Sequence, residues 1–454
     1  MNYSNLLSIL TVSGLVPITA MAQSKQEKHV HLPNIIFIYA DDLGYGDPGC
    51  YGNVNIKTPN LDRMAREGLR FTNFYSCSPV SSPSRIGFLT GRYQVRSGIT
   101  EVLFPNSSGG IDSSEVTIAE LLKEKGYVTG IIGKWHLGHL PQYLPLKHGF
   151  DYWFGLPYSN DMEWQPRKDP PLPLIRNETI VDQPAYQNTL TQRYTSEAMN
   201  FISRNKDHPF FLYFAHTFPH VPLHVSAEFK HTSSSLYGDV VQELDKSVGD
   251  ILNILKFYGL EENTMVVFSS DNGAGYGGNV PDSIGHGSNG SLKGWKATTF
   301  EGGIREPAIV YWKGKIKPGT QISDPAIMLD WFPTFASLAD CKLPAGRIID
   351  GKDISGLLFN TGKRDGNEFY FYFDGQFEAM RSGKWKYKKA HGDYKQKDLT
   401  SHGYLLYNLE EDPGETTNLI EKYQKIAEEM RIKMDKFVLN MGQSPVPKFQ
   451  SYNK

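Results

Sequence analysis

The 454-residue sequence has little of what marks several classes of protein. Three cysteines are too few for a framework of disulfide bonds. The 47 basic residues are balanced by 49 acidic ones, so the chain lacks the excess of positive charge that nucleic-acid binding requires. Beyond residue 22 there is no apolar run long enough to cross a bilayer. We therefore expect neither nucleic acid as a partner nor stable insertion in a membrane.

Residues 1–22 are predicted to be a signal peptide. An apolar stretch over residues 6–20 ends in the small-x-small pattern AMA at 20–22, and polar residues follow. Residues 1–5 contain no Lys or Arg, which leaves a buried N-terminal helix as the alternative. Gln23 stands where a lipid-anchored protein would have a cysteine. We expect export without a lipid anchor.

Short apolar runs alternate with amphipathic stretches over residues 23–362. Strands buried on both faces of a parallel sheet are apolar throughout, whereas helices between them show apolar residues at helical spacing. The runs predict strands at residues 34–40, 127–132, 209–215, 264–269 and 307–312. The other stretches predict helices between Pro59 and Gly68 and at residues 115–125 and 236–258. The pattern is typical of an α/β domain with a large mixed, mostly parallel sheet flanked by helices.

The composition changes after about residue 362. Aromatic-rich segments at 369–373 and 384–387 predict strands of a separate antiparallel sheet, and residues 423–439 predict a closing helix. We therefore expect a larger N-terminal α/β domain over residues 23–362. A smaller C-terminal α+β subdomain is expected over residues 363–454.

Polar side chains follow four of the predicted strands. They are Asp41 and Asp42 after the first strand, Lys134 and His136 after the second, His216 and His220 after the third, and Asp271 and Asn272 after the fourth. A helix cap explains any one of these residues, but not the whole set. Because the carboxyl ends of parallel strands meet at one edge of a sheet, we expect a functional site there.

The acidic residues of this set predict a metal site. Asp41, Asp42, Asp271 and Asn272 all offer oxygen, and adjacent carboxylates repel each other unless a cation lies between them. No His or Cys shares their spacing, which disfavours zinc. The donor set therefore favours a hard cation, Ca²⁺ or Mg²⁺.

Residues 81–92, with the sequence SSPSRIGFLTGR, contain a helix start. Ser81 lies at its front, where the positive end of a helix stabilises anions.

Several segments together resemble the type I sulfatases of the alkaline-phosphatase-like superfamily. The matching segments are ADDLGYGD at 40–47, residues 81–92, GKWHLG at 133–138, SDNG at 270–273 and TTFEGG at 298–303. The resemblance is strongest to the branch of arylsulfatase A and N-acetylgalactosamine-6-sulfatase. Family nucleophiles are Cys or Ser followed by x-Pro-Ser-Arg, a pattern that Ser81 completes and Cys77 does not.

The resemblance implies a set of site residues. Catalytic residues would be Ser81 as formylglycine, Arg85, Lys134, His136, His220 and Lys296, and substrate-binding residues would be Lys134, Ser159, His220 and Lys296. Metal ligands would be Asp41, Asp42, Asp271, Asn272 and the modified Ser81, with Ca²⁺ as the ion and Mg²⁺ as the alternative. The formylglycine hydrate would attack sulfur with one hydroxyl and expel sulfate with the other.

The roles of the remaining residues follow the same resemblance. Arg85 would hold the hydrate, and Lys134 and Lys296 would bind the sulfate. His136 would act as the base that releases sulfate, and His220 as the acid that protonates the departing sugar oxygen.

The resemblance also implies partners and a location. The substrate would be a sulfated carbohydrate, with galactose or N-acetylgalactosamine favoured. A serine at position 81 resembles bacterial proteins matured by a radical-type enzyme, which favours secretion across the inner membrane to a bacterial periplasm or cell surface. Two alternatives stay open: a phosphatase or phosphodiesterase of the same superfamily, and a non-catalytic protein that binds sulfated glycans if Ser81 is unmodified.

Overall fold

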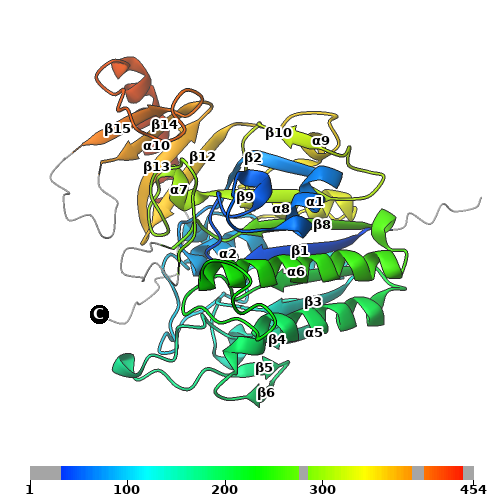
Figure 1. The fold of residues 1–454 in the computed structure, drawn as a ribbon. Helices are drawn as coiled ribbons and strands as arrows, with labels where there is room; N and C mark the ends of the chain where they lie inside the picture. The colour runs from blue at the N-terminus through cyan, green and yellow to red at the C-terminus, as the bar shows by residue number, and fades with distance from the viewer. Residues whose placement is uncertain (1–31, 276–284, 391–402, 443–454) are drawn as a thin grey trace, which may run out of the picture. The chain divides into compact units, whose positions relative to one another are not determined.

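Strands in the computed structural model, which describes residues 32–275, 285–390 and 403–442, form a large sheet with a parallel centre (Figure 1). Its strands are β1 (Asn34–Ala40), β2 (Leu69–Tyr75), β3 (Val128–Gly133), β4 (Tyr152–Gly155), β5 (Leu174–Arg176), β6 (Thr179–Asp182), β7 (Phe210–Ala215), β8 (Thr264–Ser270), β9 (Arg305–Tyr311), β10 (Thr320–Ile322) and β11 (Ala326–Ile327). The order is β10-β2-β9-β8-β1-β7-β3-β4-β5-β6, with β11 beside β2. Strands β8, β1, β7, β3 and β4 run parallel, whereas β9, β5 and β6 introduce antiparallel pairs. The predicted fold class is confirmed. The predicted signal peptide, residues 1–22, lies outside the described residues.

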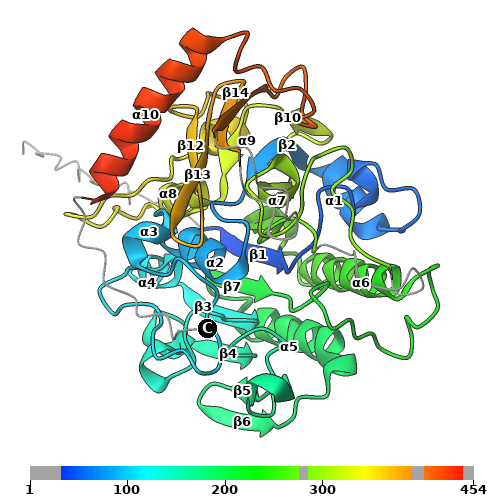
Figure 2. The same cartoon turned by 90° about the vertical axis from the view of Figure 1, so that its left-hand side faces the viewer.

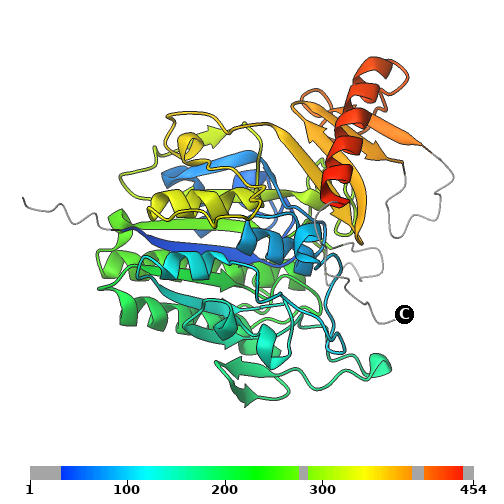
Figure 3. The same ribbon diagram turned by 180° about the vertical axis from the view of Figure 1, so that it is seen from behind.

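Helices cover both faces of this sheet. They are α1 (Pro59–Glu67), α2 (Ser81–Thr90), α3 (Gln94–Ser97), α4 (Ile118–Lys123), α5 (Leu190–Asn205), α6 (Leu236–Phe257), α7 (Glu301–Ile304), α8 (Trp331–Leu338) and α9 (Ser355–Leu358). Side chains of β1 alternate between the two cores, because successive residues of a strand point to opposite faces. Ile36 and Ile38 pack in the cluster that also holds buried residues of α5 and α6, and Phe37 stacks on Phe88 of α2. Helices α5 and α6 lie on the side of the sheet seen in Figure 1, and α8 lies on the side seen in Figure 3.

A second sheet follows in the C-terminal part of the chain. It is antiparallel, with the order β12 (Glu368–Phe373), β13 (Gln376–Ser382), β14 (Trp385–Lys389) and β15 (Tyr404–Asn408). The closing helix α10 (Gln424–Gly442) lies across it (Figure 2). Among the described helices, none has both the length and the apolar composition needed to cross a membrane.

Candidate active site

Two pairs of polar residues meet where β1 and β8 end. Asp41 and Asp42 follow β1; Asp271 and Asn272 follow β8, which is parallel to β1 and in register with it up to its last residue. The Asp42 backbone N–H donates to Asp271 Oδ1 at 3.1 Å, and Asn272 Nδ2 donates to Asp42 Oδ1 at 2.7 Å. Asp42 has a φ of 63°, a backbone conformation that non-glycine residues adopt mainly in turns and functional sites.

The N-terminal half of α2 brings Ser81 and, one turn later, Arg85 to the acidic pairs. Ser81 is the first residue of the helix, and Val80 before it has an extended backbone. The Ser81 hydroxyl donates to Asp41 Oδ1 at 3.1 Å, and Arg85 Nη2 donates to Asp271 Oδ2 at 2.9 Å. Because Arg85 is completely buried, it is a fixed positive charge against the acidic pairs.

Lys134 connects the nucleophile candidate to the predicted substrate serine. It follows Gly133, the last residue of β3. Its ammonium donates to Asp41 Oδ2 at 2.6 Å, to Ser81 Oγ at 3.3 Å and to Ser159 Oγ at 3.2 Å. Burial lowers the pKa of Lys134, although Asp41 acts in the opposite direction. Burial likewise raises the pKa of Asp41, but the nearby positive charges outweigh it and lower that pKa overall.

His136 is buried, and its two ring nitrogens have different surroundings. Its Nε2 lies 2.9 Å from the Leu103 carbonyl oxygen, which can only accept, so Nε2 carries the proton. Its Nδ1 is buried and has no hydrogen-bond partner among the described residues. Burial and the charges of Lys134 and Arg85 hold the pKa of His136 well below its usual value. His136 is therefore neutral, with a lone pair at Nδ1 that can accept a proton.

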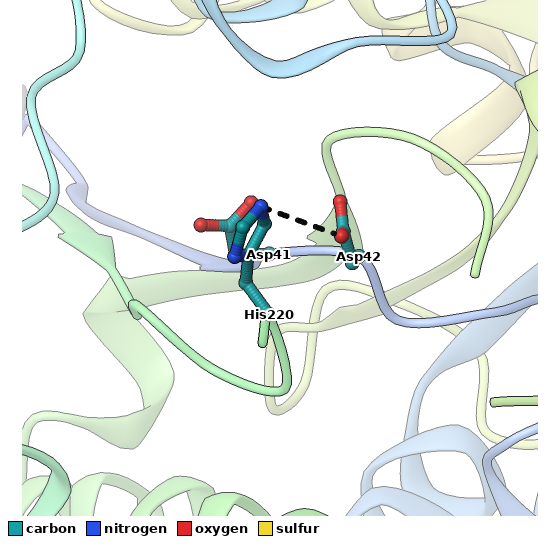
Figure 4. Close-up of side chains that lie close together, drawn as sticks. All are labelled: Asp41, Asp42 and His220. Atoms are coloured by element: carbon teal, nitrogen blue, oxygen red, sulfur yellow. Dashed lines mark ion pairs between the residues drawn. The ribbon is translucent and has the colours of Figure 1, made fainter. Parts of the chain in front are cut away.

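His220 lies beside the acidic pairs rather than apart from them. Its Nε2 is 3.6 Å from Asp42 Oδ2, and ligand atoms of Asp41, Asp42 and His220 all lie within 4.8 Å of one another (Figure 4). Its Nδ1 contacts the Val221 carbonyl oxygen, so Nδ1 carries a proton and Nε2 faces the site.

Lys296 reaches the site from the segment before α7. Its ammonium donates to Asp42 Oδ2 at 2.9 Å. Its backbone N–H donates to the Ala274 carbonyl at 2.9 Å, which ties the segment to the loop after β8. The residues predicted to have catalytic, substrate-binding or metal-binding roles thus converge, Ser159 through its contact with Lys134. His216 is the exception, because its Nε2 lies 3.4 Å from the Ser247 hydroxyl of α6.

The donor atoms fit a hard cation. Asn272 Oδ1 is buried without a hydrogen-bond partner among the described residues, and an amide oxygen is a ligand that Ca²⁺ accepts readily. Carboxylate oxygens of Asp41 and Asp42 lie within 4.8 Å of each other and of a ring nitrogen of His220, and the Ser81 hydroxyl is 3.1 Å from Asp41 Oδ1. Arg85, Lys134 and Lys296 already pair with the three aspartates. A divalent cation would therefore add net positive charge, and its binding would depend on coordination by several oxygen atoms at once.

A pocket of about 430 Å³ includes Pro222, two residues after His220, in its lining; the other lining residues are Asn160, Asp161, Glu163, Trp164 and Arg167. Trp164 is 57% exposed, and the Arg167 guanidinium stacks over its ring while pairing with Asp169. Asn160 Nδ2 donates to the Pro222 carbonyl at 3.1 Å, joining the two loops that form the pocket. The pocket thus combines one exposed aromatic ring with polar side chains, so it offers both an apolar surface and hydrogen-bonding groups.

Sequence reasoning missed some contributors. Tyr213, whose hydroxyl lies 3.3 Å from Arg85 Nη1, belongs to a strand whose apolar pattern marks all its residues as core. The Leu103 carbonyl fixes the His136 tautomer, but a backbone atom leaves no signal in a sequence. Trp164 could have been found as an isolated aromatic residue in a polar, proline-rich stretch.

The family models agree with this arrangement. Residues 33–341 match the sulfatase family, and residues 293–440 match the C-terminal model of N-sulphoglucosamine sulphohydrolase. Human arylsulfatase A is 40% identical over 432 residues, covering 86% of this chain and 83% of that protein. Canine N-acetylgalactosamine-6-sulfatase is 39% identical and covers 84% of this chain and 81% of its own length.

The structural comparison leads to the same family. A sulfatase from Pseudoalteromonas sp. superposes with a TM-score of 0.83 at 28% identity, covering 92% of each chain. The resemblance in the motifs is thereby confirmed over most of the sequence. The chain belongs to the sulfatase family of sulfuric ester hydrolases.

Proposed function

We propose that the protein removes O-sulfate from a sulfated carbohydrate, using Ser81 after its oxidation to formylglycine together with a Ca²⁺ ion. The observation that carries the proposal is the position of the Ser81 hydroxyl, 3.1 Å from Asp41 Oδ1 and 3.3 Å from Lys134 Nζ, on the first turn of a buried helix. A nucleophile there has carboxylates on one side and a cationic donor for an anionic ester on the other.

Oxidation of Ser81 is assigned to a radical-type sulfatase-maturing enzyme. When present, the formylglycine hydrate supplies one hydroxyl that attacks sulfur and another that lets sulfate leave. Arg85 contributes a fixed positive charge 3.6 Å from the carboxylate of Asp41 that Ser81 also contacts. His136 takes up a proton at Nδ1, because its Nε2 proton is committed to the Leu103 carbonyl.

The metal would be held by Asp41, Asp42, Asp271, Asn272 and the side chain at position 81. When bound, the ion supplies positive charge that orients a sulfate oxygen and offsets its charge. Ca²⁺ is the proposed ion, and Mg²⁺ is the alternative. Lys134 and Lys296 bind the remaining sulfate oxygens as charged donors.

His220 is the proposed acid. Its Nδ1–H is used by the Val221 carbonyl, so a second proton on Nε2 is the one that can pass to the departing sugar oxygen. Asp161 lines the neighbouring pocket; burial raises the pKa of its carboxyl, but the charges of His220, Lys296 and Lys134 outweigh burial and lower it overall.

The leaving group is proposed to be a galactose or N-acetylgalactosamine unit that occupies the pocket of Asn160, Asp161 and Trp164. The canine relative is named for N-acetylgalactosamine, which supports this assignment. Ring stacking on Trp164 and hydrogen bonds to the carboxylate of Asp161 are the interactions that such a sugar offers. The protein is proposed to be secreted to a bacterial periplasm or cell surface.

Two alternatives are weaker. A two-metal phosphatase needs a further set of Asp and His ligands, and within the described ranges one group of His, Cys, Asp or Glu side chains is close enough to share an ion. A glycan-binding protein without turnover would need neither the buried nucleophile candidate Ser81 nor a buried histidine, His136, with an unpartnered acceptor nitrogen among the described residues.

The proposal is tested on protein produced together with the maturing enzyme. Mass spectrometry should find the Ser81 peptide lighter by two hydrogens, and the same preparation should release sulfate from a panel of sulfated mono- and disaccharides. Ser81→Ala is the matched inactive control. An unmodified Ser81 peptide in active enzyme contradicts the formylglycine assignment, and preferential hydrolysis of phosphate esters contradicts the sulfatase activity itself.

A further inference from the structure

A buried cluster of charges joins the small C-terminal sheet to the large domain. Lys386 of β14 has no exposed side-chain surface, and its ammonium lies 2.9 Å from Glu301 Oε1 and 2.9 Å from Glu415 Oε1. Glu301 begins α7 in the large domain, and Glu415 follows β15. Although burial raises the pKa of Glu301, Lys386 and two arginines outweigh it and lower that pKa to about 2.

The contacts of this cluster converge on residues 293–301, which we call the Lys296 segment. The Glu301 backbone N–H donates to Glu415 Oε2 at 2.6 Å, and Lys293 Nζ donates to the Glu415 carbonyl at 3.2 Å. From β14, Lys388 Nζ donates to Thr299 Oγ1 at 2.9 Å. The C-terminal part of the chain therefore holds the segment on both sides of Lys296.

The opposite side of the Lys296 segment touches the catalytic loops. Besides the bond from Lys296 to Ala274, the Ala297 N–H donates to the Pro79 carbonyl at 2.9 Å, two residues before Ser81. Ala297 has a φ of 65°, a left-handed conformation that an alanine keeps only when its surroundings impose it. Up to α7 the segment has no helix or strand of its own. Its shape therefore depends on contacts from both sheets.

A buried ion pair contributes little net stability compared with well-packed apolar side chains, because both charges lose their hydration. It can instead fix the relative positions of the segments that carry the charges, because each buried ammonium must lie next to a carboxylate. We propose that Lys386 is a positioning residue for catalysis: through Glu301 and Glu415 it fixes the Lys296 segment, and with it the Lys296 ammonium that binds sulfate. This inference rests on the role proposed above for Lys296.

The test is a double-mutant cycle on the full-length, matured enzyme. Lys296→Met, Lys386→Met and the double variant are compared for kcat and KM on a sugar sulfate and for inhibition by inorganic sulfate. Because a displacement of about 1 Å costs about 100-fold in rate, Lys386→Met should lower kcat/KM by about 10- to 100-fold and weaken sulfate inhibition. In the Lys296→Met background it should have little further effect. Lys386→Arg should restore part of the loss.

The controls separate positioning from folding. Lys433→Met removes an exposed ion pair with Glu368 in the same part of the chain and should leave the kinetics unchanged. If Lys386→Met does not fold, the charge-balanced pair Lys386→Met and Glu415→Gln takes its place in the cycle. Additive losses, or a lower melting temperature with unchanged kinetics, would overturn this inference alone. Unchanged kinetics in Lys296→Met would overturn the proposed role of Lys296 and this inference with it.

Discussion

Single residues at the candidate site carry charges with almost no exposed surface. The side chains of Asp41, Arg85 and Lys134 are completely buried, and each contacts an opposite charge. Removing one partner leaves the other as a buried, uncompensated charge, which costs about 3–5 kcal/mol. Substitutions of these residues therefore lower stability as well as activity. Of the two histidines with proposed catalytic roles, His220 has one such partner, Asp42 at 3.6 Å, whereas His136 contacts a backbone carbonyl through Nε2.

The acid role of His220 predicts a dependence on the leaving group. A sugar alkoxide needs a proton to depart, whereas an activated phenolate leaves unaided. His220→Ala should therefore lower kcat/KM by about 100-fold or more on a sugar sulfate and much less on an aryl sulfate. His136→Ala should impair both substrates alike. The ratio of losses on the two substrates is the measurement, and equal losses for His220→Ala would make it a plain sulfate-binding residue.

His216 predicts a loss of stability in acid. It is fully buried, and burial lowers its pKa to about 3. The unfolded chain binds its proton near pH 6.5, so the stability present above pH 6.5 is lost as pH falls toward 3, by about 1.4 kcal/mol per pH unit. His216→Gln should thus lose less stability than the parent protein between pH 7 and pH 5. Urea unfolding at both pH values measures this, with exposed His208→Gln as the control; an unchanged pH response in His216→Gln would refute it.

The sequence predicted a set of residues that the fold brings together, but not how they pair. The motifs pointed to Ser81, Lys134 and Ser159 separately, whereas the ammonium that joins them depends on how three segments pack. His220 and Asp42 were expected at the same edge of the sheet, but their direct contact at 3.6 Å was not predicted, because the resemblance assigned His220 to the leaving group. A motif can indicate what a residue does, whereas the contacts between residues depend on how the segments pack.

At the scale of elements, the carboxyl ends of the strands determine where the side chains of the candidate site lie. Gly133 closes β3 with a φ of 112°, and a Cβ there would lie 1.7 Å from the Ala215 carbonyl oxygen of β7. The close approach of these two strands sets where Lys134 leaves the sheet. Glycine, which has no Cβ, is the residue that allows both the positive φ at position 133 and the close approach of β3 to β7.

Gly133→Ala should therefore separate β3 from β7 and displace Lys134 and His136. We expect a loss of activity of about 100-fold, because small displacements of catalytic groups are costly. Gly126 is the matched control: it has a φ of 81°, but a Cβ added there would meet no described atom within 4 Å. Gly126→Ala should cost about 1–2 kcal/mol of stability and leave kcat unchanged. Comparable losses of activity in both variants would contradict a specific role for the β3–β7 approach.

Some elements were easier to predict than others. β1 has the predicted bounds because its seven residues are all apolar or buried. β2 was not predicted, because Arg70, Thr72 and Asn73 interrupt its apolar pattern. β9 begins two residues earlier than expected, at Arg305, since Arg305 and Glu306 are buried by partners that only the fold supplies.

At the scale of the whole molecule, the site joins segments that are far apart in sequence. Asp41, Ser81, Asp271 and Asn272 come from the ends of two parallel strands and the start of one helix. The rule that ligands bind at the carboxyl edge of such a sheet allowed this convergence to be predicted. The support from β14 could not be predicted, because nothing in the spacing of Lys386 and Glu301 indicates that they meet.

A metal held by these segments should stabilise the entire fold. An ion that binds only the native state adds about 2.7 kcal/mol at 100 times its dissociation constant. Removing it with a chelator should lower the melting temperature and abolish activity, and Ca²⁺ should restore both. Asn272→Ala removes the buried amide oxygen that has no other partner among the described residues, so its melting temperature should no longer respond to Ca²⁺. The exposed Asn55→Ala should respond like the parent protein.

Calorimetry with Ca²⁺, Mg²⁺ and Zn²⁺ identifies the ion that the protein binds. Two tightly bound ions per chain, or tightly held zinc, would favour the phosphatase alternative over the sulfatase mechanism proposed above.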